Sequence, residues 1–174
     1  MKEIPVESLD FRTTYFGKDW MALTAGTEAG FNTMTIAWGQ IGSLWDCEGP
    51  SGKGTYPVAT VYVRPQRYTK NFMDKERLFT LNWFGGAMRS ALAYCGSHSG
   101  RDVDKVKATG LTPVFSAGTV YFKEAKLVFI CRKLYQSRLL ESGFTDAAVS
   151  ERNYPDKDFH EMYIGEIIQV LAED

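Results

Sequence analysis

Apolar and polar side chains alternate over several short stretches of the chain. The stretch from Val58 to Arg64 alternates strictly, with Ala59, Val61 and Val63 on one face and polar side chains on the other. A period of two is typical of a strand with one buried face. The pattern therefore predicts a half-buried β-strand, which Pro65 ends because proline lacks a backbone donor.

Further runs of apolar and β-branched residues predict more strands. These strands are expected at Trp20 to Ala25, Thr33 to Trp38, Leu78 to Trp83, Val120 to Phe122, Ala125 to Leu134 and Met162 to Leu171. The first two flank the turn from Gly26 to Gly30, which predicts a hairpin.

Short helices are expected between the later strands. The predicted helices span Lys70 to about Glu76 with Thr69 as the cap, Ala87 to Tyr94, one turn capped by Asp102, and Thr145 to Arg152. Strands outnumber helices and are unevenly spaced, which favours a small antiparallel barrel with inserted helices over a doubly wound sheet.

The segment from Gly39 to Tyr56 shows neither helical nor strand periodicity. It is rich in glycine and contains the turn sequence Gly49-Pro50-Ser51-Gly52. Such a segment is too long for a tight turn, so we expect a functional loop.

Composition narrows the class of protein. The 174 residues match one domain spanning residues 1–174, and 20 basic against 21 acidic residues leave too little positive charge for nucleic-acid binding. No apolar stretch is long enough to predict a signal peptide or membrane span. Cys47, Cys95 and Cys131 are irregularly spaced, which favours free thiols and a cytoplasmic location.

Candidate chemistry starts at Arg64-Pro65-Gln66-Arg67-Tyr68-Thr69, at the end of one predicted strand and the start of a helix. Guanidinium groups and a helix N-terminus attract phosphate. The alternative interpretation is two surface arginines and a simple helix cap. Position alone does not separate the two.

Three other segments are also open to two interpretations. Residues Asn32 to Trp38 could border a flat ring or fill the barrel, and Ser97 to Lys105 could approach a phosphate or form a solvated loop. His160 could donate to a flavin or nicotinamide, protonate a product near neutral pH, or be structural. No P-loop, Rossmann fingerprint or zinc motif occurs, because Cys95 and His98 lack a second pair of ligands.

Three segments in series resemble the flavin reductase-like, or flavoredoxin-type, family. They are Asn32-x-Met34-Thr35-x-Ala37-Trp38, Val63-Arg64-Pro65-x-Arg67-Tyr68-Thr69 and Ser99-Gly100-Arg101-Asp102-x-Asp104-Lys105, and their order and spacing match. The resemblance implies an antiparallel Greek-key split β-barrel, FMN near a homodimer interface, and electron supply from NADH, NADPH or a redox protein.

The same resemblance implies roles for individual residues. The residues expected beside the isoalloxazine are Asn32, Thr33, Met34, Thr35, Trp38, Asn82 and Trp83. Those expected at the phosphate or ribityl end are Arg64, Arg67, Tyr68, Thr69, Ser99 and Lys105. His160 is the catalytic candidate, placed near the nicotinamide or flavin face, and no metal ligand is expected.

Three functions follow as hypotheses. The first is an NAD(P)H:flavin oxidoreductase, and the second is a flavoredoxin-like carrier whose tight FMN serves a partner protein and is not reduced directly by NAD(P)H. The third is a barrel that has lost flavin. The segment from Gly39 to Tyr56 departs from the compact proline-rich segment of typical reductases, so the electron donor stays open.

Overall fold

The computed structural model describes residues 1–49 and 52–173. The strands are β1 (Lys2–Ile4), β2 (Met21–Thr27), β3 (Gly30–Ile36), β4 (Gly39–Gly49), β5 (Gly52–Val63), β6 (Leu78–Trp83), β7 (Pro113–Ser116), β8 (Thr119–Phe122), β9 (Leu127–Arg138) and β10 (Glu161–Ala172). The helices are α1 (Tyr15–Asp19), α2 (Thr69–Lys75), α3 (Arg89–Ser97), α4 (Lys105–Thr109) and α5 (Ala147–Asn153), with 3-10 turns at Val6–Ser8 and Glu141–Gly143.

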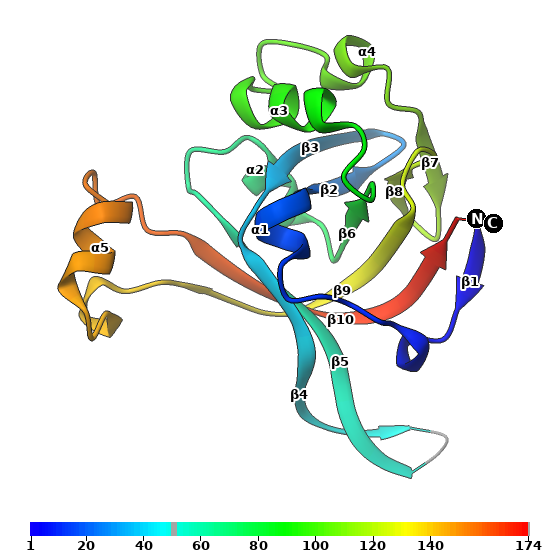
Figure 1. Cartoon of the computed structure of the whole chain (residues 1–174), viewed down its shortest axis with the longest axis horizontal. Helices are drawn as coiled ribbons and strands as arrows, with labels where there is room; N and C mark the ends of the chain where they lie inside the picture. Colours follow the sequence, from blue (N-terminus) through cyan, green and yellow to red (C-terminus); the bar gives the residue numbers. More distant parts are fainter. Residues whose placement is uncertain (50–51, 174) are drawn as a thin grey trace.

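The strands form an antiparallel sheet with the order β3-β2-β6-β9-β10-β5-β4, while β7 and β8 form a separate pair. Strand β10 pairs with β9 along its length, with β5 along its first half and with β1 near its end. The first and last strands of the chain therefore lie side by side (Figure 1). Helices α3 and α4 lie together over one end of the barrel. The prediction of a mostly antiparallel β fold with a few helices is confirmed.

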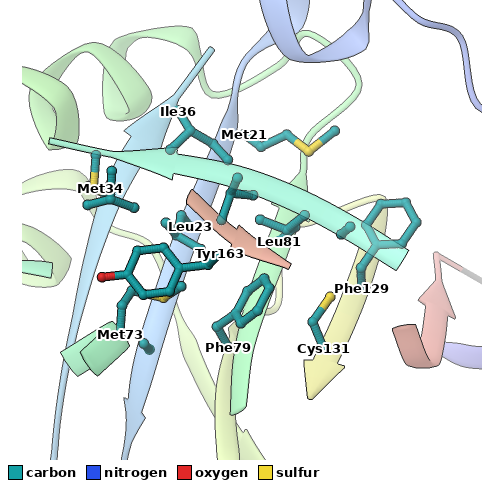
Figure 2. Packing of buried hydrophobic residues seen from close by; sticks show 14 of the residues in the cluster. Met21, Leu23, Met34, Ile36, Met73, Phe79, Leu81, Phe129, Cys131 and Tyr163 are labelled. Carbon is teal, nitrogen blue, oxygen red and sulfur yellow. The ribbon is translucent and has the colours of Figure 1, made fainter. Parts of the chain in front are cut away.

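Alternating strand residues form the core inside this sheet. Leu23, Phe79, Phe129 and Tyr163 come from four different strands and are fully buried in one cluster (Figure 2). Gly165 makes close packing possible, because a Cβ there would lie 2.6 Å from the Phe79 ring. This core holds the strands of the barrel together.

The expected loop from Gly39 to Tyr56 is wrong. Strands β4 and β5 pair from Gly39–Val61 to Gly49–Gly52, and the outer part of this hairpin extends away from the barrel (Figure 1). Many glycines and a bulge between Leu44 and Asp46, where Trp45 has a φ of 57°, hide the strand pattern in the sequence. Pro50 and Ser51 lie outside the described residues.

Smaller differences concern helix starts and one strand pair. Thr69 is the first residue of α2 and makes no capping bond. Asp104, and not Asp102, caps the following helix by accepting from the Lys107 N–H at 3.0 Å. Strand β7 is not predicted by the sequence pattern, and it pairs with β8 in a two-stranded sheet apart from the main one. Among the described residues, no helix has the length and apolarity needed to cross a membrane.

Candidate functional site

Two adjoining cavities share Met34 and Arg67 and together form one groove. The aromatic cavity has a volume of about 180 Å³ and is lined by Met34, Thr35, Ile36, Ala37, Trp38, Tyr62, Arg64, Arg67 and His160. The cationic cavity has a volume of about 160 Å³ and is lined by Met34, Gln66, Arg67, Tyr68, Thr69, Ser97, His98, Ser99, Arg101 and Lys105. The groove brings together segments that lie far apart in the sequence.

Positive charge and hydroxyl groups dominate the cationic cavity. Arg67, Arg101 and Lys105 line it together with two serines and Thr69, and no carboxylate of the described residues does. Low-dielectric walls with one sign of charge strengthen the local potential. This cavity therefore suits an anion, and guanidinium groups match the geometry of phosphate oxygens.

The three segments around the cationic cavity interlock at Asn32. This β3 residue is buried and donates from Nδ2 to the Thr69 Oγ1 at 2.7 Å. Gly100 approaches from the other side, where a Cβ would lie 2.0 Å from the Asn32 Oδ1. A larger residue at position 100 would displace the amide that orients Thr69.

Lys105 is a buried cation held by backbone oxygens. Its Nζ donates to the Thr33 carbonyl and to the Cys95 carbonyl, each at 2.8 Å. Burial lowers the pKa of Lys105, and Arg67 lowers it further, while Cys95 opposes the shift. Two of three ammonium hydrogens are used, so one remains for a ligand in the cationic cavity.

The two arginines beside Lys105 have different supports. Arg67 donates from Nη1 to the Gly96 carbonyl at 2.7 Å, and the guanidinium of Arg101 lies 4.7 Å from the centre of the Tyr68 ring. One contact is a hydrogen bond and the other a cation–π interaction. Both leave donor groups available to an anion.

His160 lines the aromatic cavity beside Trp38. Its ring is buried, and the Trp38 ring lies 4.9 Å away at a tilt of 42°. Burial lowers the pKa of His160 to about 4, with a further contribution from Arg64 that Asp158 partly opposes. The lowered pKa leaves the imidazole neutral near pH 7, where it can donate or accept a hydrogen bond.

Arg64 does not lie at the cationic end. Its guanidinium pairs with Asp158, donates from Nη2 to the Asn153 carbonyl at 2.8 Å and lies 5.2 Å from the centre of the Tyr154 ring. The structure therefore places Arg64 in the wall of the aromatic cavity, where it ties the end of β5 to the segment after α5.

Asn82 and Trp83 do not line the groove. Asn82 is fully buried, donates to the Ala22 carbonyl and accepts from the Phe122 N–H. Trp83 stacks on Tyr15 with ring centres 4.5 Å apart. Both side chains serve packing between β6 and its neighbours, so position along the chain was misleading for them.

The remaining predicted residues have mixed placements. Met34, Thr35, Trp38, Tyr68, Thr69, Ser99 and Lys105 line the groove, as do Arg67 and His160. Asn32 donates a hydrogen bond to the Thr69 hydroxyl, and the Thr33 hydroxyl is hydrogen-bonded to the Thr24 hydroxyl. Sequence reasoning did not select Tyr62 or Arg101, although Arg101 lies within the segment proposed to approach a phosphate.

Comparisons with known proteins agree with this architecture. A family model described as flavin reductase like domain matches residues 55–174. A search of curated proteins gave no significant match.

Several solved structures share the fold. Flavoredoxin of Desulfovibrio vulgaris (Miyazaki F) has a TM-score of 0.65 at 22% identity, covering 96% of this chain and 76% of that one. An FMN-binding protein from Thermus thermophilus with bound 1-cyclohex-2-enone has 0.63 at 20% identity, covering 99% and 81%. Nitrilotriacetate monooxygenase component B from Bacillus cereus has 0.65 at 15% identity, covering 100% and 82%. The expected split barrel is thereby confirmed.

Proposed function

This chain belongs to the flavin reductase like domain family, and from that premise we propose that it binds FMN in the groove and transfers electrons through it. The observation that carries the proposal is the chemical difference between the two joined cavities, one aromatic and one cationic. FMN has a matching asymmetry, with a flat ring at one end and a phosphate at the other. Solved neighbours described as FMN-binding support the choice of flavin.

The cationic cavity would hold the phosphate. Arg67 and Arg101 offer guanidinium donors, Lys105 offers its third ammonium hydrogen, and the hydroxyls of Thr69 and Ser99 complete the set. The Asn32 amide orients the Thr69 hydroxyl, and Gly100 leaves room for that amide. The donors are thus held in place by the protein itself, which reduces the ordering cost of binding.

The aromatic cavity would hold the ring. Met34, Ile36, Trp38 and Tyr62 supply apolar surface, and the neutral His160 supplies one polar group. Ligand sites of this kind combine apolar walls with a few polar groups that set orientation. Bound FMN would supply the redox chemistry, and the chain would orient it and shield it from water.

We assign NADH or NADPH as the electron donor and infer a cytoplasmic homodimer that acts as a flavin oxidoreductase. Free thiols at Cys47, Cys95 and Cys131 fit a reducing compartment. The second candidate, a carrier reduced by a partner protein, differs only in the donor, so one experiment separates the two.

The test is a visible absorption spectrum of the purified protein after FMN addition, followed by anaerobic NADH, NADPH and dithionite. Flavin bands that bleach with a nicotinamide are expected and support an oxidoreductase. Bands that bleach only with dithionite would favour the carrier. No retained flavin after gel filtration, and no change in FMN fluorescence on titration, would refute flavin binding.

A further inference from the structure

Tyr154 lies behind His160, outside the groove that His160 lines. Its side chain is buried, and its hydroxyl lies 2.8 Å from the His160 Nδ1. The lining of the aromatic cavity includes His160 but not Tyr154. Any effect of Tyr154 on a ligand in this cavity must therefore pass through the imidazole.

The direction of this hydrogen bond follows from chemistry. A neutral imidazole carries one N–H and one lone-pair nitrogen, whereas a phenol can donate its single hydrogen. Burial keeps the Tyr154 hydroxyl protonated by raising its pKa, and burial also keeps His160 uncharged. The phenol oxygen can also accept, but accepting from an Nδ1–H would leave the buried Tyr154 hydrogen without an acceptor among the described residues, which is costly, so Tyr154 donates to Nδ1. The imidazole proton is then on Nε2.

Packing holds both rings in this arrangement. The Tyr154 ring stacks on Phe159 at 4.7 Å and contacts Phe144 at 5.7 Å, with the Arg64 guanidinium above it. Trp38 lies against the imidazole. Rotation of either ring would break several contacts at once, so the hydrogen bond sets one orientation of His160.

We propose that Tyr154 is a positioning residue that fixes His160 as its Nε2–H tautomer and presents that N–H to the aromatic cavity. The matching ligand atom is a neutral acceptor, such as the carbonyl oxygen of the nicotinamide carboxamide. This last step rests on the proposed function, whereas the tautomer and its cause concern the chain alone.

The tautomer can be measured without flavin. The chain has two histidines, so protein labelled with ¹⁵N-histidine gives a simple long-range ¹H–¹⁵N spectrum, and His160→Gln identifies the signal of position 160. The expected wild-type pattern is a protonated Nε2 and an acceptor Nδ1 at pH 7. The Tyr154→Phe variant keeps the ring and should show mixed tautomers, whereas Tyr121→Phe, on β8, should not.

Kinetics give the second readout. Loss of one neutral hydrogen bond predicts about a two- to tenfold lower rate of flavin reduction at saturating nicotinamide in Tyr154→Phe, with the FMN dissociation constant unchanged. An Nδ1–H tautomer in the wild type would overturn the proposal even if Tyr154→Phe failed to fold. Unchanged tautomers or rates in a folded Tyr154→Phe would do the same. Absent FMN binding in the wild type would refute the proposed function and leave the tautomer result standing.

Discussion

Arg67 lines the cationic cavity from the turn between β5 and α2, and Thr69 lines it from the first residue of α2. The structure gives each an anchor, the Gly96 carbonyl for Arg67 and the Asn32 amide for Thr69. We expect the Arg67→Ala/Thr69→Ala double variant to bind FMN more weakly. Each lost phosphate contact should cost about 1–3 kcal/mol, and fluorescence titration would measure the change.

The matched control is Arg12→Ala, which removes the same charge from an exposed residue outside the groove lining. Its FMN affinity should equal that of the wild type. Equal affinity in the double variant would mean that phosphate is held elsewhere.

His160 makes stability depend on pH. Its pKa is about 4 in the folded chain against an ordinary value of 6.5, so the unfolded chain binds a proton that the folded chain refuses between these values. The contribution of neutral His160 to the free energy of unfolding is therefore fully present above about pH 6.5 and is lost as the pH drops toward 4. Urea unfolding should show this loss in the wild type and a smaller loss in His160→Asn.

His98→Asn is the control for that measurement, because it removes the other histidine of the chain. It should keep the wild-type slope between pH 6.5 and 4.5. If His160→Asn had the wild-type slope as well, the imidazole would have to be charged in the folded chain.

Single residues were predictable only where the local sequence decides their placement. Met34, Arg67 and Thr69 lie in two of the short segments that carry the family resemblance, and the structure brings them together at the groove. Arg64 and Asn82 were misplaced because their partners, Asp158 and Phe122, are remote in the chain. No local pattern reports such tertiary contacts.

The segment that carries α5 is held to the barrel by few contacts. Asp158 accepts from Arg64 and, at 2.8 Å, from the Gln66 Nε2. Asp158→Asn would weaken both, and a charge-assisted bond contributes about 1.5–3 kcal/mol. We expect about tenfold or greater acceleration of amide exchange in α5 with β6 unchanged, as measured by hydrogen exchange with mass spectrometry.

Asp156→Asn offers a matched control, since this exposed carboxylate lies two residues away and has no part in the Arg64 contact. Exchange in α5 should then stay at the wild-type level. Acceleration spread evenly over β6 and α5 in Asp158→Asn would instead indicate loss of global stability.

At the same scale, strand prediction succeeded where alternation is strong and failed where glycine interrupts it. The second half of β5 alternates and is predicted as a strand, whereas the sequence from Gly39 to Tyr56 predicts a loop where β4 and the first part of β5 lie. In this region β4 and β5 pair with each other, and the pairing includes a bulge at Trp45. Such a ribbon has a register but little intrinsic strand propensity.

The β4–β5 hairpin bears on the oligomeric state of the molecule. Strand β5 pairs with β10 only from Val58 to Val63, so the outer part of the β4–β5 hairpin has no third strand within the described chain. Isolated two-stranded ribbons are marginally stable in water. Trp45 lies on β4 of this hairpin and Tyr135 lies on β9, and the centres of their rings are 6.1 Å apart. The two residues are 45% and 43% exposed. In the homodimer proposed above, the second copy of the chain would cover this apolar pair.

We therefore expect light scattering to give twice the chain mass of 19.6 kDa for the wild type. The Trp45→Glu/Tyr135→Glu variant should shift toward 19.6 kDa, because burying two carboxylates in an interface is costly. Val149→Glu places one carboxylate on another exposed apolar residue, in α5, and should remain dimeric. A monomeric wild type would exclude the homodimer, and a dimeric double variant would move the interface away from the hairpin.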